Sequence, residues 1–533
     1  MKRILVIQLT RTGDLIQTTP LIQDLVNSAP EVRLDLLVLA GNEEVVRGMP
    51  GVDRVLTLGE QEVLRMNDRL MENRPSVDAP HSPSQWLRDS GLRDYDEIHD
   101  VSAQWLGYWV TRELSAPTKV GGILTRSGEL LFRGDWATYQ TALLDFREWN
   151  RVNLVDLFRG YSLSSVTPGP GFRPYLARDP YWAHGLGSPG RGFIGINPGA
   201  SESQRRYPVE GFMAIIQGCL RLGYHPVLVG APMDRPLCEQ IANAGAGGIS
   251  NLAGQTRIPE MAQLLSGMTA LVSNDTGAIH MAAAMGTPVI TLSGPASDSG
   301  PSAFVHETGP WGEGHIVLQA PLSQPGRLLE VISPELVLDT LQWRLGRISA
   351  EEMKDRLHFA TGVEAWHGER ISDAQDPLGG VRYEPLFPSR HSSRNEEARR
   401  LRTFFARHLA MGAEEMLPRP AAAGRPLVSN LDPTLMLLSR ALESAAARAR
   451  RLCQLAVADP ESMILRSSTA QLQSQIQRAL DSAPGDSTIG PLAAFVRWKL
   501  KMVSAEGTLS GVLAHQHRVL SRVAEWICAL DGP

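Results

Sequence analysis

The chain has 533 residues, of which 43% are hydrophobic and 20% are charged, and its formal net charge is −5. This length is enough for about three domains of ~150 residues each, and the composition is that of a globular protein. The slightly acidic balance argues against a general nucleic-acid binder. The four cysteines form no Cys-x-x-Cys pair, so neither a disulfide framework nor a zinc site is indicated. No apolar run approaches the ~20 residues of a membrane span.

Predicted strands and helices alternate from residue 3 to about residue 347. The elements of the first block are expected at residues 3–9, 20–26, 34–39 and 97–101. The first run is read as a buried strand and not as a signal peptide, and the first helix is expected to begin with Thr19 as its N-cap and Pro20 at its first position. The polar, proline-rich residues 71–91 are predicted to be a surface insertion, and residues 164–174 an inter-domain linker.

A second alternating block follows the linker. Its strands are expected at residues 193–197, 226–229, 269–272 and 288–292, and its helices at residues 209–222, 258–266, 278–285 and 334–346. The pattern is typical of α/β domains with parallel, doubly wound sheets, and it predicts two Rossmann-like domains over residues 1–165 and 175–347. Beyond residue 350 helical apolar spacing dominates and strand signals vanish, so residues 350–533 are expected to be an appended helical region.

Four loops follow predicted strands, at positions where α/β folds bind ligands. They are TRTGD at residues 10–14, NPGASESQRRYP at 197–208, VGAPMD at 229–234 and NDTG at 274–277. Asp275, Thr276 and Gly277 are expected at the start of a helix, where backbone N–H groups and the helix dipole suit an anion such as phosphate. His280 lies one turn further on and is expected to reach that helix end.

Each of these loops, taken alone, also has a plain structural interpretation. Asp14, Asp234 or Thr276 can serve only to cap a helix, and Arg205 and Arg206 can be a solvated pair. Neither block has a G-x-G-x-x-G sequence after its first strand, and the chain has no P-loop sequence, so dinucleotide binding and P-loop chemistry are not indicated.

Taken together, the loops resemble glycosyltransferase family 9, the ADP-heptose:lipopolysaccharide heptosyltransferases. The stretches that carry the resemblance are ILVIQLTRTGDLIQTTPL, NPGASESQRRYP, LVGAPMD, NLAGQT and SNDTGAIHMAAAMGTPVITLSGP. Arg205 stands where the family usually has Lys, and Tyr207 where it has Trp. The resemblance covers residues 1–347 and implies a GT-B fold, in which the N-terminal domain holds the acceptor and the C-terminal domain holds the nucleotide-sugar.

The resemblance also implies an inverting transfer that uses neither a metal nor a cofactor. ADP-heptose is the expected donor, and a lipopolysaccharide core or another bacterial surface glycan is the expected acceptor. The protein is expected to be cytoplasmic, with peripheral contact to the inner membrane or to a protein partner through its C-terminal helices left open. No nucleic-acid partner is expected.

The expected roles of the residues follow from the chemistry of the transfer. Asp14 is the expected base that takes the proton from the acceptor hydroxyl. The departing diphosphate gains charge and needs fixed positive groups. The groups expected there are Arg205 or Arg206, the turn of Asp275, Thr276 and Gly277, and His280. Asp234 is expected to accept hydrogen bonds from ribose hydroxyls, while Gln255 and Thr256 border the base.

Two alternative functions remain open from the sequence. The first is a related transferase that uses another nucleotide-sugar or a protein acceptor. The second is a degenerate transferase that acts as a scaffold through its helical tail. The sequence Asp94-Tyr95-Asp96 is a D-x-D, which holds a metal in a different glycosyltransferase fold, but here it is expected at the N-terminal end of a strand and is not interpreted as a metal site.

The tail carries an apolar stripe among clustered arginines. Leu401, Phe404, Phe405 and Leu409 are spaced to fall on one face of a helix. The interpretation we favour is that the stripe packs within the chain. The alternative is a basic apolar face that meets an anionic membrane or an acidic partner.

Overall fold

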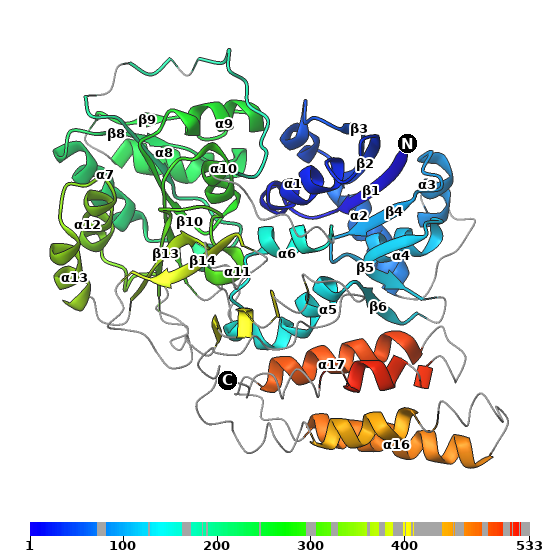
Figure 1. Ribbon diagram of the computed structural model, residues 1–533. Helices are drawn as coiled ribbons and strands as arrows, with labels where there is room; N and C mark the ends of the chain where they lie inside the picture. The colour runs from blue at the N-terminus through cyan, green and yellow to red at the C-terminus, as the bar shows by residue number, and fades with distance from the viewer. Residues whose placement is uncertain are drawn as a thin grey trace.

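The computed structural model describes residues 1–71, 82–125, 128–162, 172–183, 185–187, 190–244, 247–294, 305–320, 329–359, 363–371, 379–386, 398–399, 401–403, 405–406, 409, 440–450, 452, 463–481, 489–504, 512–513, 515–521 and 523. Two α/β domains lie side by side, and helices from the end of the chain lie along the first domain (Figure 1). The expected fold class, two Rossmann-like domains with an appended helical region, is therefore confirmed.

The first domain is built on a sheet whose described strands run in the order β3-β2-β1-β4-β5-β6. The strands are β1 (Lys2–Gln8), β2 (Val32–Leu39), β3 (Val52–Leu58), β4 (Glu97–Asp100), β5 (Thr118–Leu124) and β6 (Leu130–Arg133). All pairs are parallel except β5 with β6. The helices are α1 (Thr12–Val26), η1 (Asn42–Val46), α2 (Glu60–Met71), α3 (Pro83–Asp89), α4 (Trp105–Glu113), α5 (Asp135–Ala142), η2 (Leu144–Trp149) and α6 (Leu154–Gly160). Ile4 and Val6 of β1 are fully buried, as expected for a central parallel strand covered on both faces.

Helix α1 begins eight residues earlier than the sequence predicts, with Thr12 instead of Pro20 as its first residue and Arg11 instead of Thr19 as its N-cap. Pro20 lies inside the helix, where it has no N–H for the carbonyl oxygen of Ile16. The Thr19 hydroxyl donates to that oxygen at 2.7 Å and so replaces the missing bond. The expectation that Pro20 starts the helix is therefore wrong, and Asp14 lies in the first turn of α1.

The second domain has a sheet whose described strands run in the order β14-β13-β12-β11-β10-β7-β8-β9. The strands are β7 (Phe193–Asn197), β8 (His225–Leu228), β9 (Ser250–Asn251), β10 (Ala270–Asn274), β11 (Val289–Ser293), β12 (Ile316–Gln319), β13 (Glu364–Arg370) and β14 (Val381–Pro385). The strands from β9 to β12 are parallel. The helices are η3 (Ser203–Arg205), α7 (Val209–Arg221), η4 (Pro232–Asp234), α8 (Arg235–Ala244), α9 (Ile258–Ser266), α10 (Gly277–Met285), α11 (Val305–Thr308), α12 (Pro334–Arg344) and α13 (Ala350–Phe359).

Strands β13 and β14 correct the expectation that strand signals end before residue 350. Both strands pair antiparallel, β13 with β12 and β14 with β13, so they extend the second sheet at one edge. Strand β13 carries Glu364, His367, Glu369 and Arg370. This polar content hides the alternation of a half-buried strand. Helix α13 packs against α12 of the same domain.

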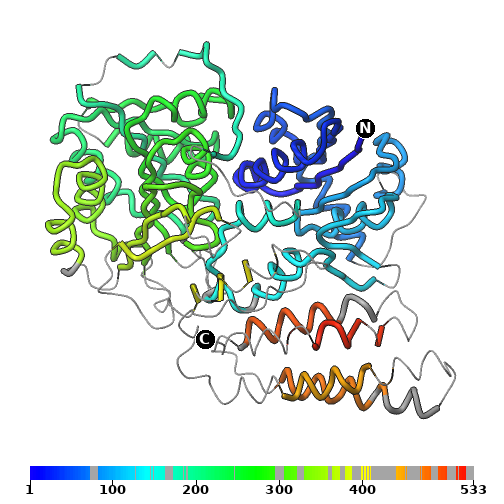
Figure 2. The backbone as a smooth tube through the Cα atoms, in the orientation of Figure 1, coloured from blue at the N-terminus to red at the C-terminus, as the bar shows by residue number. Residues whose placement is uncertain are grey.

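The appended helices pack on the first domain. Helices α16 (Met463–Asp481) and α17 (Ile489–Ser504) are the long ones in the described part of the tail, and Figure 2 shows them below the first domain. Helix α17 contacts α5 and β6, where Phe132 and Trp498 meet edge to face with ring centroids 5.2 Å apart. In the described parts of the chain, every helix is too short or too polar to cross a membrane.

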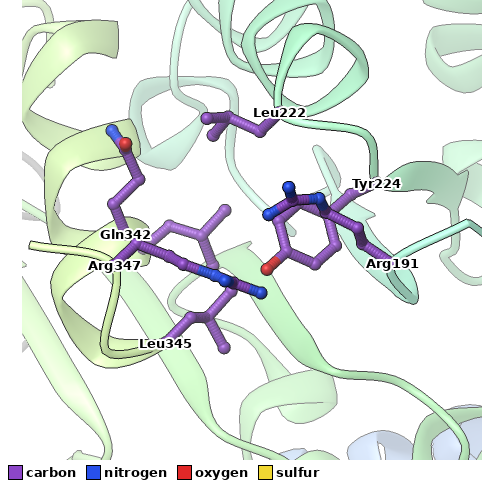
Figure 3. Close-up of a pocket in the computed structure, with 7 residues that line it drawn as sticks. Arg191, Leu222, Tyr224, Gln342, Leu345 and Arg347 are labelled. Carbon is purple, nitrogen blue, oxygen red and sulfur yellow. The ribbon is translucent and has the colours of Figure 1, made fainter.

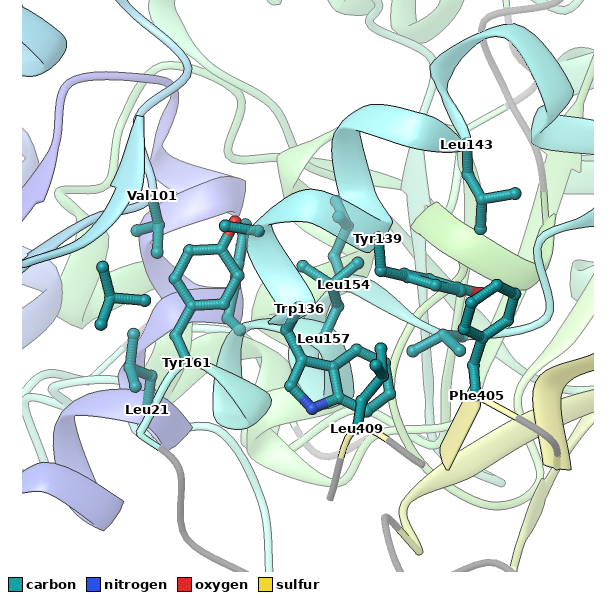
Figure 4. Close-up of a cluster of buried hydrophobic side chains, with 14 of the residues drawn as sticks. Leu21, Val101, Trp136, Tyr139, Leu143, Leu154, Leu157, Tyr161, Phe405 and Leu409 are labelled. Atoms are coloured by element: carbon teal, nitrogen blue, oxygen red, sulfur yellow. The ribbon is translucent and has the colours of Figure 1, made fainter. Parts of the chain in front are cut away.

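The apolar stripe of the tail packs inside the chain, as favoured from the sequence. Leu401, Phe405 and Leu409 are 5%, 0% and 4% exposed and belong to the main hydrophobic core. Phe405 lies against Tyr139 of α5, with ring centroids 4.8 Å apart (Figure 4). Phe404 falls outside the described residues.

Candidate active site

The starts of helices α1 and α10, from different domains, are in direct contact. A Cβ atom on Gly13 would lie 3.0 Å from Cδ2 of His280 and 3.2 Å from Cα of Gly277. A side chain at Gly13 would therefore push the two helices apart. Each helix follows the carboxyl end of a parallel strand, β1 or β10, so two helix N-termini meet at one place between the domains.

Asp14 lies at this contact, in the first turn of α1. Its Oδ2 accepts a hydrogen bond of 3.2 Å from the backbone N–H of Arg11, so it does cap its own helix, as the plain interpretation holds. Burial raises the pKa of the Asp14 carboxyl, and hydrogen bonds from Thr10 and Arg11 offset part of that rise. The result is a partly buried carboxylate that is more basic than an ordinary aspartate.

The turn before α10 is held by polar side chains of the neighbouring strand. Asn197, at the end of β7, donates from Nδ2 to the Thr276 hydroxyl at 2.9 Å and to the Ser273 hydroxyl at 3.1 Å. Thr276 is the N-cap residue of α10, but its side chain accepts no bond from that helix. The first N–H groups of α10 therefore have no side-chain cap from Thr276, which suits them to an anionic ligand.

Arg205 and Arg206 have different hydrogen-bond partners in the structure. Nη2 of Arg205 donates to the carbonyl oxygen of Asp275 at 2.9 Å and to its Oδ2 at 3.0 Å. The Arg206 guanidinium instead donates to the carbonyl oxygen of Ala200 in its own loop, at 3.2 and 3.0 Å. Of the two arginines, Arg205 is therefore the one at the start of α10.

Asp275 and His280 are both strongly affected by burial. Burial raises the pKa of Asp275, and Arg205 and Arg147 offset part of the rise. His280 is 8% exposed, and burial lowers its pKa to about 4. The imidazole is therefore neutral at pH 7 in the ligand-free protein, so the expectation that His280 supplies a fixed positive charge is wrong for this state. A neutral imidazole can still donate or accept one hydrogen bond.

The remaining predicted residues lie on two adjoining loops at the same edge of the sheet. Oδ2 of Asp234 accepts from the backbone N–H of Ala231 at 2.9 Å, so Asp234, the last residue of η4, caps the start of that helical turn. Its carboxylate also packs on Gly199, where a Cβ atom would lie 2.2 Å from the Asp234 Cγ. Exposed Gln255 donates to the Asn251 carbonyl oxygen at 2.8 Å, and Thr256 follows it on the same loop.

Hydrogen bonds and packing contacts join the loops of the second domain that carry the predicted residues. The backbone N–H of Gly254 donates to the carbonyl oxygen of Gly230 at 3.0 Å, which ties the loop of Gln255 to the loop of Asp234. Asp234 reaches the NPG loop, and Arg205 joins that loop to Asp275. All four loops singled out from the sequence therefore lie at the carboxyl ends of strands β1, β7, β8 and β10.

Sequence reasoning missed three groups near Asp275. Arg147 of η2 forms a two-fold ion pair with Glu307 of α11, with Nε–Oε2 and Nη2–Oε1 distances of 3.0 and 3.1 Å. The charge of Arg147 lowers the pKa of Asp275, which places this first-domain cation close to the site. Tyr383 of β14 is also near, because the Asp275 charge raises the already high pKa of the Tyr383 phenol. These residues belong to no sequence motif and are distant in the chain.

A pocket of about 200 Å³ lies in a different part of the second domain (Figure 3). Its lining residues are Arg191, Leu222, Tyr224, Leu341, Gln342, Leu345 and Arg347. The residues before strands β7 and β8 line it, so it is at the opposite end of the sheet from the turn before α10. Helices α7 and α12 also end there, and arginines suit the negative ends of helices. We therefore do not include this pocket in the candidate site.

The D-x-D sequence is likewise remote from the site. Oδ2 of Asp96 accepts from the backbone N–H of Arg3 at 2.7 Å, and the Tyr95 hydroxyl donates to Oδ2 of Asp35 at 2.7 Å. Both contacts lie at the N-terminal end of β4, as expected from the sequence. In the described part of the chain no three His, Cys, Asp or Glu side chains are grouped as metal ligands.

Comparison with known proteins gives the following matches. Residues 173–325 match glycosyltransferase family 9 (heptosyltransferase). Lipooligosaccharide heptosyltransferase 2 of Haemophilus influenzae is 36% identical over 112 residues, which are 20% of this chain and 32% of that protein. Lipopolysaccharide heptosyltransferase 1 of Pseudomonas aeruginosa is 24% identical over 309 residues, which are 57% of this chain and 81% of that protein.

Solved structures are similar as well. A glycosyl transferase family 9 protein from Veillonella parvula is 20% identical, with a TM-score of 0.49, over 65% of this chain and 98% of that one. The chain spans about a third of the length of the heptosyltransferase 2 proteins that it matches, for which 32% is covered in Haemophilus influenzae and in Escherichia coli.

Proposed function

We propose that this protein is an inverting, metal-independent glycosyltransferase, because residues 173–325 match glycosyltransferase family 9 (heptosyltransferase). We take ADP-heptose as the donor, and a lipopolysaccharide core or another bacterial surface glycan as the acceptor. The observation that carries the proposal is the contact of α1 with α10, which sets Asp14 of one domain opposite the Arg205–Asp275 pair of the other.

Asp14 is the base in this proposal. It takes the proton of the acceptor hydroxyl while the acceptor oxygen forms a bond to the anomeric carbon of the sugar. The bond from that carbon to the diphosphate oxygen breaks, and its electron pair leaves with the diphosphate, so the configuration at the carbon is inverted. The raised pKa of Asp14 supports this role, because a base works best when its pKa is nearer to the working pH.

The diphosphate lies at the start of α10 in this proposal. Three groups stabilise the charge that it gains: the N–H groups at the start of α10, which the Thr276 side chain does not cap, the Arg205 guanidinium and an N–H of neutral His280. Asp275 would repel a phosphate, so we assign it two other tasks. It holds Arg205 in place, and its remaining acceptor capacity takes hydrogen bonds from hydroxyls of the donor.

The nucleoside occupies the adjoining loops. Asp234 lies beside the NPG loop, where a carboxylate can accept from ribose hydroxyls, and Gln255 and Thr256 border the base. Because the leaving diphosphate is stabilised by Arg205 and helix α10, the mechanism needs no divalent cation. Activity is therefore expected to persist in EDTA.

Isothermal calorimetry with ADP, UDP and GDP tests the donor class, and mass spectrometry of a heptose-deficient lipopolysaccharide incubated with ADP-heptose tests the transfer. We expect binding of ADP, and an acceptor that gains one heptose in the presence of EDTA. Preference for UDP or GDP would favour a transferase with another nucleotide-sugar. Absence of binding to all three would favour the scaffold alternative and refute the enzyme.

A further inference from the structure

A buried arginine of the tail connects the two domains. Arg402 is 3% exposed and donates from Nη1 to the carbonyl oxygen of Arg151 at 2.6 Å, and from Nη2 to that of Gly379 at 2.8 Å. Arg151 lies between η2 and α6, at the end of the first domain, whereas Gly379 leads into β14 at the edge of the second sheet. One guanidinium therefore holds main-chain groups of both domains.

A buried carboxylate strengthens the same junction. Asp156 of α6 accepts from Nε1 of Trp311 at 2.9 Å and from the backbone N–H of Val381 at 3.0 Å. Gly380 has a φ of +84°, and a Cβ atom there would lie 2.0 Å from Oδ1 of Asp156, so the chain passes the carboxylate without a side chain. The Arg402 charge acts on Asp156, whose pKa burial raises to about 6. The tail thus supplies a positive charge that stabilises this buried acid, in addition to that of Arg159.

The tail residues around Arg402 also touch both domains. Nη1 of Arg399 lies 3.3 Å from both carboxylate oxygens of Glu384 in β14. On the other side, Phe405 packs edge to face on Tyr139 of α5 and on Phe495 of α17 (Figure 4). The described helical residues 398–399, 401–403, 405–406 and 409 are therefore fixed to the second sheet through charges and to the first domain through aromatic rings.

The junction leads directly to the candidate site. The strand that Arg399 and Arg402 hold carries Tyr383, whose hydroxyl donates to the carbonyl oxygen of Pro310 at 2.6 Å. Just before Pro310 lies Glu307, which is paired across the domains with Arg147. The Arg147 charge lowers the pKa of Asp275, and the Asp275 charge raises the pKa of the Tyr383 phenol. The junction therefore borders the groups around Asp275.

We propose that the C-terminal extension sets the relative position of the two domains, with Arg402 as the positioning residue that joins them beside the candidate site. The proposal rests on the function proposed above. Arginine suits the task because its planar group carries separate donors toward two carbonyl oxygens, whereas a lysine ammonium is a single point charge. Sugar transfer needs the two domains in the correct relative position, because a 1 Å misplacement of the reacting groups can cost ~10²-fold in rate.

The test compares Arg402→Leu and Arg402→Lys with Arg497→Ala. Arg497 bonds only within the tail in the described contacts, to Asp481 and to the Leu480 carbonyl oxygen, so its variant controls for loss of tail stability. We expect Arg402→Leu to lower kcat by about tenfold or more and to raise KM for the acceptor, with ADP affinity within about twofold of the wild type, because the cradle at α10 lies in one domain. Arg402→Lys should recover part of the kcat that Arg402→Leu loses, and Arg497→Ala should keep the wild-type kcat.

Small-angle X-ray scattering provides a readout that does not depend on turnover. We expect Arg402→Leu to increase the radius of gyration of the ligand-free protein, and Arg497→Ala to leave it unchanged. The proposal is overturned if Arg402→Leu keeps wild-type kcat, KM and scattering, or if Arg497→Ala lowers kcat as much at an equal fall in melting temperature. If the wild type transfers no sugar, the proposed function fails. Scattering alone then still decides whether Arg402 sets the relative position of the two domains. If Arg402→Leu does not fold, Arg402→Lys carries the same comparisons.

Discussion

At the scale of single residues, Asp14 is the group on which the chemistry depends most. We expect Asp14→Asn to reduce turnover by ~10²-fold or more, because the amide cannot take the acceptor proton. ADP affinity should remain near that of the wild type, since Asp14 is assigned to the acceptor side. Near-normal turnover of the purified variant would remove Asp14 from the mechanism.

The pH dependence gives a second test of the same residue. Burial raises the pKa of Asp14, and a general base is inactive when protonated. The wild-type kcat/KM should therefore fall as the pH falls through the raised pKa, at a higher pH than the usual aspartate value would give. The residual activity of Asp14→Asn should lack this acidic limb, and an unchanged limb in that variant would assign it to another group.

His280 and Arg205 should contribute unequally to ADP binding. The pKa of His280 is lowered to about 4, so a neutral hydrogen bond is lost in His280→Ala, which is worth ~0.5–1.5 kcal/mol. Arg205→Ala removes a charged donor, and the expected loss is ~1.5–3 kcal/mol. Calorimetry at pH 7 measures both losses. A loss for His280→Ala equal to that for Arg205→Ala would mean that the bound diphosphate charges the imidazole.

At the scale of elements, the sequence predicts best where apolar runs and loop motifs coincide. The strand at residues 193–197 and the helix at 258–266 match β7 and α9 to the residue. Their ends are marked by strong local signals, such as the polar NPG loop after β7 and the Pro at the second position of α9. The loop motifs also predicted residues that lie together at the carboxyl ends of the strands in the structure.

The misses have physical causes that lie beyond local sequence. Pro20 predicts a helix start, but the Thr19 hydroxyl satisfies the carbonyl oxygen that a mid-helix proline leaves free, so α1 runs through it. Strand β13 is too polar to show apolar alternation, and its pairing with β12 and β14 defines it. Arg147 lies near the site only because of tertiary packing, and no sequence motif surrounds it.

Strands β13 and β14 also change what truncation of the chain should do. From the sequence, a chain that ends near residue 361 would retain the whole donor site. In the structure it would lack both strands and with them Tyr383, whose hydroxyl fixes Pro310 behind Asp275. We expect that chain to melt lower and to bind ADP more weakly, by differential scanning fluorimetry and calorimetry. A chain ending at residue 386 provides the matched control, and equal ADP affinity of the two would contradict the role given to β14.

At the scale of the whole molecule, the apolar stripe of the tail packs into the core next to the first domain. Leu401, Phe405 and Leu409 are inside the core, and Arg399 and Arg402 are bonded to Glu384 and to main-chain carbonyl oxygens. The three described apolar side chains of the stripe are therefore buried away from a bilayer, and these two arginines are engaged within the protein. The residues of the stripe that the structure describes therefore favour the intramolecular interpretation.

Phe405 tests this interpretation directly. Because its ring is fully buried between Tyr139 and Phe495, Phe405→Ala should lower the free energy of unfolding by ~3–5 kcal/mol, measured by chemical denaturation. Leu144→Ala is the control, since Leu144 is 59% exposed and a surface change of this kind costs within ~0.5 kcal/mol. Sedimentation with anionic phosphatidylglycerol vesicles should be the same for the wild type and both variants. The opposite pattern, unchanged stability of Phe405→Ala with loss of vesicle binding, would mean that the stripe leaves the core and serves as a membrane face.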